Sequence, residues 1–401
     1  MDVFQKCRDY TRAESLRDAG VYHYFRRIAS AQDPVVTIGG KSLIMLGSNN
    51  YLGLANHPEV KAAASRAVEQ YGTGCAGSPL LNGTLELHAE LEHRLASFMQ
   101  RDAAVIFSTG FQVNLGVLSA LLGRRDIVFL DNLDHACIID GARLGLAKMV
   151  KYRHNDMADL AAKLARTSDE NGRFIVVDGV FSMEGDLCHL PELVELKRRH
   201  DLRLMVDDAH GIGVLGQHGR GTVEHFGLES EVDLVMGTFS KSLAGVGGFV
   251  CGDRYVIDFI RHNARSQIFS ASMPPASAAA VLKALEIVER EPERRQRLWE
   301  NTRYMKQALD SLGYDTGEAA SPVIPMVVGD DFTAYHMVAD LHEEGVFANP
   351  VVSPAVPAGR AMIRTSYMAT HTREHLDQAL RALEVVGRRY GVIGAKAKRR
   401  A

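Results

Sequence analysis

The sequence predicts an α/β protein, with a large domain built on a mostly parallel sheet and a smaller α+β domain after it. Two observations favour this fold class. Short apolar runs recur through residues 46–285, and they are continuous rather than alternating, as expected for strands that helices cover on both faces. Stretches with helical periodicity lie between these runs, and the alternation of strand and helix is typical of a parallel sheet.

Seven apolar runs are the strand candidates of the large domain, and four stretches between them carry the helical pattern. The strand candidates are residues 104–107, 127–130, 149–152, 174–177, 202–206, 234–236 and 248–251. The helical stretches are residues 84–99, 112–122, 155–167 and 191–200. We therefore expect a seven-stranded sheet in a domain over residues 46–285.

The segments before and after the large domain have a different pattern of charged and apolar residues. Residues 1–45 mix charged and aromatic side chains and predict an N-terminal arm with a helix over about 3–18. Residues 286–401 predict the small α+β domain, which a long helix over about 275–290 joins to the large one. Its expected elements are charged helices over roughly 292–313 and 372–391 and short strands near 323–328 and 362–365.

Composition and charge exclude several classes of protein. A hydrophobic content of 46% and a charged content of 24% are ordinary for a soluble globular protein. The net charge of −3 argues against a nucleic-acid partner, and the one basic run, 396–400, is short. No apolar run approaches the roughly 20 residues of a membrane span, and no signal peptide is apparent. Five scattered cysteines without CxxC spacing indicate reduced thiols and no metal site, so we expect a cytoplasmic protein.

A lysine, an aspartate and a histidine carry the main chemical signal. Lys241 follows a short apolar strand, and Asp207 and His210 end another strand. A lysine amine can condense with the aldehyde of pyridoxal phosphate, and a carboxylate can keep the ring nitrogen of that cofactor protonated. The pair therefore predicts pyridoxal phosphate chemistry.

Two further polar residues, Ser182 and His135, also fall just after predicted strands. Each of these side chains taken alone has an ordinary structural explanation, such as a helix cap or a buried histidine. Ligands collect at the carboxyl ends of strands in a doubly wound sheet, so the joint placement favours one site.

A phosphate group needs backbone N–H groups and the start of a helix. The turn Ser108-Thr109-Gly110-Phe111 lies between a predicted strand and a predicted helix, which is the required arrangement. Thr238 and Ser240, beside Lys241, offer hydroxyl groups to the same phosphate.

These residues stand in motifs that resemble those of the α-oxoamine synthases, which are fold-type I pyridoxal phosphate enzymes. Such enzymes condense an amino acid with an acyl thioester and release carbon dioxide. The resemblance runs from about residue 40 to about 393. The matching stretches are residues 48–54, 81–84, 134–141, 178–186, 207–210, 219–221 and 237–242.

The resemblance implies roles for the cofactor site. Lys241 would carry the cofactor and later remove the α-proton of the substrate, and Asp207 would pair with the ring nitrogen. His210 and Ser182 would contact the phenolic oxygen, and His135 would stack on the ring face. The remaining contacts implied are to the phosphate, from Thr238 and the backbone of Gly110 and Phe111.

The resemblance also implies a substrate site and a partner. Asn49 or Asn50 would face the amino acid, and Arg364 would bind its carboxylate through a bidentate fork. The family forms homodimers with shared active sites, so Ser270, Ala271 and Ser272 would reach the cofactor phosphate of the neighbouring subunit.

Four activities share these motifs: serine palmitoyltransferase, 8-amino-7-oxononanoate synthase, 5-aminolevulinate synthase and 2-amino-3-ketobutyrate ligase. The lysine loop over 238–249 and Ala271 resemble the first branch most, which favours L-serine and a long acyl chain. Pro79 and the loop 349–357 depart from that branch, so the acyl donor stays open between coenzyme A and a carrier protein, as in a secondary-metabolite synthase. An aminotransferase or an inactive partner subunit are the rival classes.

Overall fold

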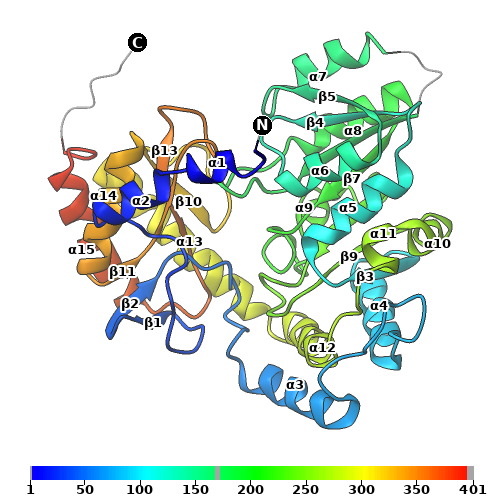
Figure 1. Cartoon of the computed structure of the whole chain (residues 1–401), viewed down its shortest axis with the longest axis horizontal. Coiled ribbons are helices and arrows are strands. Elements are labelled where there is room, and N and C mark those ends of the chain that lie inside the picture. The colour runs from blue at the N-terminus through cyan, green and yellow to red at the C-terminus, as the bar shows by residue number, and fades with distance from the viewer. Residues whose placement is uncertain (1, 168–171, 395–401) are drawn as a thin grey trace.

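The computed structural model describes residues 2–167 and 172–394, so the basic run at 396–400 lies outside the described residues. The chain forms two lobes, a large one with a central sheet and a smaller one that combines β1 and β2 with elements from α13 onward (Figure 1).

The large lobe contains the seven-stranded sheet that the sequence predicts. Its spatial order is β3-β9-β8-β7-β6-β4-β5, and β9 is antiparallel to both neighbours while the other pairs are parallel. The strands are β3 (Ala103–Phe107), β4 (Ile127–Asp131), β5 (Lys148–Tyr152), β6 (Arg173–Asp178), β7 (Arg203–Asp207), β8 (Leu234–Thr238) and β9 (Gly248–Gly252).

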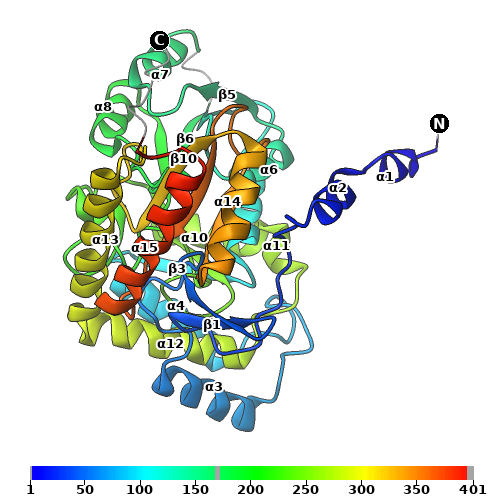
Figure 2. The ribbon, with the colours of Figure 1, turned by 90° about the vertical axis from the view of Figure 1, so that its left-hand side faces the viewer.

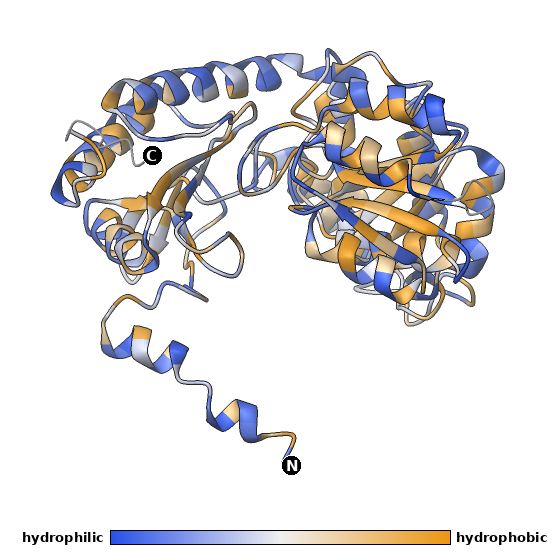
Figure 3. Cartoon of the chain, turned by 90° about the horizontal axis from the view of Figure 1, so that it is seen from above, coloured by the Kyte–Doolittle hydropathy of each residue, from blue (hydrophilic) through white to orange (hydrophobic). Residues whose placement is uncertain are grey.

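Helices cover both faces of this sheet, and the strands between them are strongly hydrophobic (Figure 3). Alternate residues of β3 belong to different apolar clusters: Ala104 and Ile106 to one, Val105 and Phe107 to the other. The continuous apolar runs of the sequence therefore reflect burial on two sides. The helices of this lobe are α3 (Pro58–Tyr71), α4 (Glu86–Phe98), α5 (Gly110–Leu121), α6 (Ala136–Leu144), α7 (Met157–Leu164), α8 (Leu190–His200), α9 (Thr222–His225), α10 (Arg254–Asn263), α11 (Arg265–Ile268) and α12 (Pro275–Arg290).

The small lobe combines two three-stranded sheets with three helices. One sheet pairs β12 (Asn349–Val351) and β10 (Val323–Gly329) with the central strand β13 (Ala361–Ser366). In the other, β2 (Lys41–Met45) pairs with β1 (Val35–Ile38) and with β11 (Val346–Phe347). The helices are α13 (Pro292–Leu312), α14 (Asp331–Glu343) and α15 (Arg373–Arg389).

The β1–β2 hairpin lies in the stretch that the sequence suggests is an arm, yet β2 pairs with β11 from the far end of the chain. The division of the chain at residues 45 and 285 stays a prediction.

The single helix predicted over 3–18 is wrong. Two short helices, α1 (Gln5–Arg8) and α2 (Arg12–Asp18), stand there, and they extend away from the body of the molecule (Figure 2). The reason is burial: α1 buries no side chain and α2 buries only Leu16, so no continuous apolar face supports one long helix. Among the described residues, no helix is both long and apolar enough to cross a bilayer.

The contact between α5 and α6 gives a test of this packing. A Cβ on Gly141 would lie 2.5 Å from the carbonyl oxygen of Asn114 on α5. We expect Gly141→Ala to lower the free energy of unfolding, because overpacking costs about 1–3 kcal/mol and exceeds the roughly 1 kcal/mol gained in helix propensity. Urea denaturation measures the change.

The control is Gly74→Ala, where a Cβ would meet no atom within 4 Å. Wild-type stability of the Gly141→Ala protein would show that α5 and α6 are not held this closely.

Candidate active site

Most of the predicted cofactor-site residues gather at one edge of the large sheet, where its parallel strands end. The register pairs Asp178, at the end of β6, with Asp207, at the end of β7. Thr238 ends the adjacent strand β8, and Lys241 follows it by three residues. A cavity of about 350 Å³ opens at this edge. The residues that line it include Gly110, Phe111, His135, Asp178, Ser182, Asp207, His210, Thr238, Ser240 and Lys241.

Lys241 contributes an amine whose proton is weakly held. Burial lowers the pKa of Lys241 to about 8, against the opposing effect of the Asp207 and Asp178 carboxylates, and Arg364 adds to the lowering. A substantial share of this amine is therefore uncharged at neutral to mildly basic pH, which a nucleophilic amine requires.

Asp207 is buried and is held by two donors. The side-chain amide of Asn114 donates a hydrogen bond of 2.6 Å to Asp207 Oδ2. The backbone N–H of Ala209 donates one of 3.1 Å to Oδ1. These bonds fix the carboxylate at the wall of the cavity.

His135 caps the start of α6, and its ring lies edge-on to the ring of Phe111. Its backbone N–H donates to Asp178 Oδ2 at 2.7 Å. Burial lowers the pKa of His135, with Lys241 acting in the same direction and Asp207 opposing. The imidazole is therefore neutral near pH 7.

His210 is buried on the same side and bonds to a tyrosine. The Tyr51 hydroxyl lies 2.7 Å from His210 Nδ1. Burial lowers the pKa of His210 well below its usual value, with Lys241 and Arg364 adding to the effect. Burial also raises the pKa of Tyr51 to about 12, so the phenol stays protonated.

The first turn of α5 approaches β8 closely at one end of the cavity. Thr109 caps the helix, and its hydroxyl oxygen accepts from the Gln112 N–H at 3.2 Å. A Cβ on Gly110 would lie 2.5 Å from Thr238 Oγ1, so glycine is required for this approach. The result is a cradle of free N–H groups beside the hydroxyls of Thr238 and Ser240, which lie 2.9 Å apart.

Arg364 comes from β13 of the small lobe and contacts Ser182, one of the residues that line the cavity. Its Nε donates to the carbonyl oxygen of Ser182 at 2.6 Å, and its Nη2 donates to Asn49 Oδ1 at 3.0 Å. Of the two candidate asparagines, Asn49 is therefore the one beside Arg364. The side chain of Asn50 bonds instead to the backbone of Ala55 and, at 3.4 Å, to that of Gln32.

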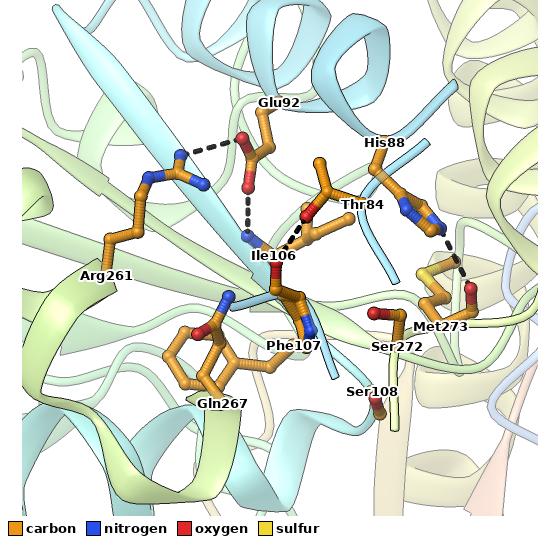
Figure 4. Close-up of a pocket in the computed structure, with 11 residues that line it drawn as sticks. Thr84, His88, Glu92, Ile106, Phe107, Ser108, Arg261, Gln267, Ser272 and Met273 are labelled. Carbon is orange, nitrogen blue, oxygen red and sulfur yellow. Dashed lines mark hydrogen bonds and ion pairs between the residues drawn. The ribbon is translucent and has the colours of Figure 1, made fainter. Parts of the chain in front are cut away.

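Ser270, Ala271 and Ser272 do not line this cavity. Ser270 Oγ accepts from the Gln112 side chain at 3.0 Å, and the carbonyl oxygen of Ala271 accepts from Ser108 Oγ at 2.5 Å. Ser272 faces a second, much smaller pocket with Ser108 and Gln267 (Figure 4). The segment therefore contacts the turn before α5 and the first turn of that helix.

Comparison with known proteins matches these features. The model of the class I and II aminotransferase family matches residues 41–383. The serine palmitoyltransferase of Sphingobacterium spiritivorum is 53% identical over 376 residues, which cover 94% of this chain and 94% of that protein. The 8-amino-7-oxononanoate synthase of Symbiobacterium thermophilum is 48% identical over 94% of this chain and 97% of that protein.

A solved structure agrees over nearly the whole chain. The serine palmitoyltransferase of S. paucimobilis, solved with bound PLP and myriocin, superposes with a TM-score of 0.95 at 36% identity and covers 98% of this chain and 100% of that one. This chain belongs to the α-oxoamine synthase family. It is a fold-type I, pyridoxal phosphate-dependent acyltransferase.

The cavity of this synthase fits the cofactor. The glycine cradle at α5 suits a phosphate, and the buried carboxylate of Asp207 suits a protonated ring nitrogen. A volume of about 350 Å³ lies within the range of small-molecule sites. We infer that Lys241, Asp207, His135, His210, Ser182 and Thr238, with the backbone of Gly110 and Phe111, hold the cofactor.

Sequence reasoning gave no role to three residues that this geometry brings into the site of the synthase. Tyr51 holds His210, Asn114 holds Asp207, and Asp178 holds the backbone of His135. Tyr51 and Asp178 lie inside matching motifs, which was a usable signal. Asn114 stands in the stretch Asn114-Leu115-Gly116, which resembles the serine palmitoyltransferase branch, but an asparagine in an apolar helix has no assignable role until its neighbours are known.

The lowered pKa of Lys241 gives a prediction for attachment of the cofactor. Below pH 8 the rate at which pyridoxal phosphate attaches to the apo-protein should rise about tenfold per pH unit, because only the uncharged amine reacts, and above pH 8 it should level off. Stopped-flow absorbance after mixing apo-protein with pyridoxal phosphate measures the rate.

Lys241→Ala is the control, and borohydride reduction should leave no cofactor attached to it. If the attachment rate levelled off only near pH 10.5, the ordinary pKa of lysine, burial would not lower the pKa of the Lys241 amine.

Proposed function

We propose that this synthase condenses L-serine with a long-chain acyl thioester, releasing carbon dioxide and forming an α-amino ketone of the 3-ketosphinganine type. The observation that carries the proposal is the position of Arg364. Its guanidinium is held by Asn49 and Ser182 and is close enough to Lys241 and His210 to lower the pKa of both. The 53% identity to a serine palmitoyltransferase over 94% of both chains supports the choice of substrates.

Arg364 binds the carboxylate of the amino acid in this proposal. Two of its nitrogens are fixed by protein oxygens, so the plane of the guanidinium is set before the substrate arrives. In this proposal the substrate carboxylate lies at the small-lobe side of the cavity and the α-carbon points toward Lys241. A bound carboxylate also holds the substrate against rotation, which keeps the Cα–H bond available and delays decarboxylation until after condensation.

Lys241 removes the α-proton, and its lowered pKa suits a base that works near neutral pH. Pyridoxal phosphate, when bound, supplies the electron sink for the charge that this proton leaves behind. Asp207, held by two donors, would stabilise the positive charge on the ring nitrogen of the bound cofactor. His135, held by Asp178, would contact the ring and orient the substrate.

The acyl donor is the open part of the substrate pair. Pro79 lines the small pocket that Ser272 also lines, and the segment 349–357, which begins with β12, leads into β13, which carries Arg364. Coenzyme A and an acyl carrier protein both present the same thioester, so the chemistry of the cavity serves either. The 48% identity to an 8-amino-7-oxononanoate synthase favours that reaction as the second candidate.

A homodimer with shared sites is part of the proposal. Apolar side chains next to the 270–272 segment are exposed in the single chain: Leu81 is 80% exposed and Phe269 is 73% exposed. Phe111 and Val246, which line the cavity, are also exposed. A second copy would cover these side chains and bring its own Ser270, Ala271 and Ser272 to the phosphate end of the cavity.

The substrate pair is tested by absorption titration of the cofactor-loaded protein with L-serine, glycine, L-alanine and L-threonine, each with and without palmitoyl-coenzyme A. We expect a saturable spectral change with serine, and release of free thiol and carbon dioxide only when the thioester is added. A response to another amino acid, or serine binding without thiol release, would redirect the search to another substrate pair or to a carrier protein.

Arg364→Lys should raise the KM for serine by about a hundredfold with a smaller effect on cofactor affinity, because a lysine keeps the charge but cannot form the planar fork. Steady-state kinetics and a cofactor titration measure the two effects.

Arg381→Lys, which changes an exposed arginine on α15, is the matched control and should leave both constants unchanged. An unaltered KM in the Arg364→Lys protein would remove Arg364 from substrate binding.

A further inference from the structure

A chain of hydrogen bonds joins two residues that line the cavity, and one of its middle members lines the cavity as well. Its ends are Asp207 and His135, and its middle members are Asn114 on α5 and Cys137 at the start of α6. Asn114 is 0% exposed and Cys137 is 3% exposed, and both stand among apolar side chains. A buried amide is costly unless it is bonded, so its bonds are informative.

The direction of the bond at Asn114 follows from its neighbours. Nδ2 lies 2.6 Å from Asp207 Oδ2 and 3.0 Å from Cys137 Sγ. A carboxylate can only accept, so the amide nitrogen, and not the oxygen, must face Asp207. The two N–H bonds of this nitrogen therefore go to the carboxylate and to the sulfur. Oδ1 has no partner among the described residues, which indicates that the orientation is set by Asp207 and Cys137.

The direction of the bond at Cys137 follows in the same way. Its sulfur accepts from Asn114, and burial and the Asp207 carboxylate raise the pKa of the thiol, so the S–H proton is retained. His135 Nδ1 lies 2.8 Å from this sulfur and also accepts, at 3.3 Å, from the backbone N–H of Cys137. An atom that accepts from a backbone N–H carries no proton itself. The thiol therefore donates to Nδ1, and the imidazole proton is on Nε2.

We propose that Asn114 and Cys137 are positioning residues that hold His135 as the neutral imidazole with its proton on Nε2 and couple it to the carboxylate of Asp207. The proposal rests on the proposed function in that His135 acts on the cofactor and substrate. Nε2–H is then the polar group of His135 that is left for the cavity, where it can donate to a substrate carboxylate. The charged and titratable groups near His135 include Asp178, Asp207, Lys241, Cys137 and His210.

The test compares Cys137→Ala with Cys137→Ser in cofactor-loaded protein labelled with ¹⁵N-histidine. The ¹⁵N shifts of His135, assigned by their loss in His135→Gln, report the tautomer and the pH midpoint of the ring. Serine keeps an O–H donor and should keep the Nε2–H tautomer. Alanine removes the donor to Nδ1, so we expect a larger share of the Nδ1–H tautomer and a midpoint higher by about one pH unit, because the neutral ring loses a bond.

Asn114→Leu tests the other end of the chain. Asp207 would lose a donor to its charged form, and we expect cofactor affinity to fall by about tenfold. Ser119→Ala is the matched control on the same helix, because among the described residues the Ser119 hydroxyl bonds only to the backbone of Leu115 and Gly116.

Three results would overturn the proposal: a wild-type tautomer and midpoint in Cys137→Ala, equal shifts in Cys137→Ala and Cys137→Ser, or wild-type cofactor affinity in Asn114→Leu. Neither measurement uses an amino acid or a thioester. A wrong choice of substrate therefore leaves these results readable, and turnover of serine in the same preparations tests that choice separately.

Discussion

The parallel pairing of β4, β6, β7 and β8 is the constraint on which the site depends. Parallel strands in register end at the same edge, and the pairing of Asp178 with Asp207 shows that the two carboxyl ends are level. The turns that follow these strands must therefore share one rim, and each contributes a polar residue to it. A slip of one residue in the register of β7 would turn the side chain of Asp207 to the other face of the sheet, and the site would lose this carboxylate.

Several buried carboxyl groups lie close together near this rim. Hydrogen-bond donors stabilise each of them separately. Asp134 accepts from the backbone N–H groups of Asp131 and Asp178, and Asp178 accepts from that of His135. Burial still raises the pKa of Asp134 and Asp178 well above the usual range. His154 supplies the positive charge. Burial opposes its protonation, but bonds to Asp131 and Asp186 raise its pKa to about 10, so it is charged at neutral pH.

The seven strands of the large sheet and their places along the chain could be predicted from the sequence, because buried strands leave continuous apolar runs. The helix over 136–144 could not be predicted from the sequence. Its two isoleucines and Gly141 have weak helix propensity, and its stability comes from packing against α5. The N-terminal helix was over-extended for the converse reason. Its residues can form a helix, but α1 buries no side chain against the rest of the protein and α2 buries only Leu16.

The residues of the site were also only partly predictable from the sequence. Lys241 and Asp207 were predictable because their chemistry is distinctive and their spacing is local to neighbouring strands. Asn114 and Cys137 were not, because each acts only through a neighbour that is far away in sequence: Asn114 precedes Asp207 by 93 residues and Cys137 by 23. Pairings of this kind are fixed by the crossing of two helices, which no local pattern encodes.

The pairing of the β1–β2 hairpin with β11 has a consequence for the order of folding. Asn49 follows β2, and the arginine it contacts lies 315 residues later, in β13. The sheet rim with Lys241 can form as soon as the large lobe has left the ribosome, whereas the arginine end of the cavity must wait for nearly the whole chain. A nascent chain would therefore acquire the means to bind the cofactor before it acquires the means to select an amino acid.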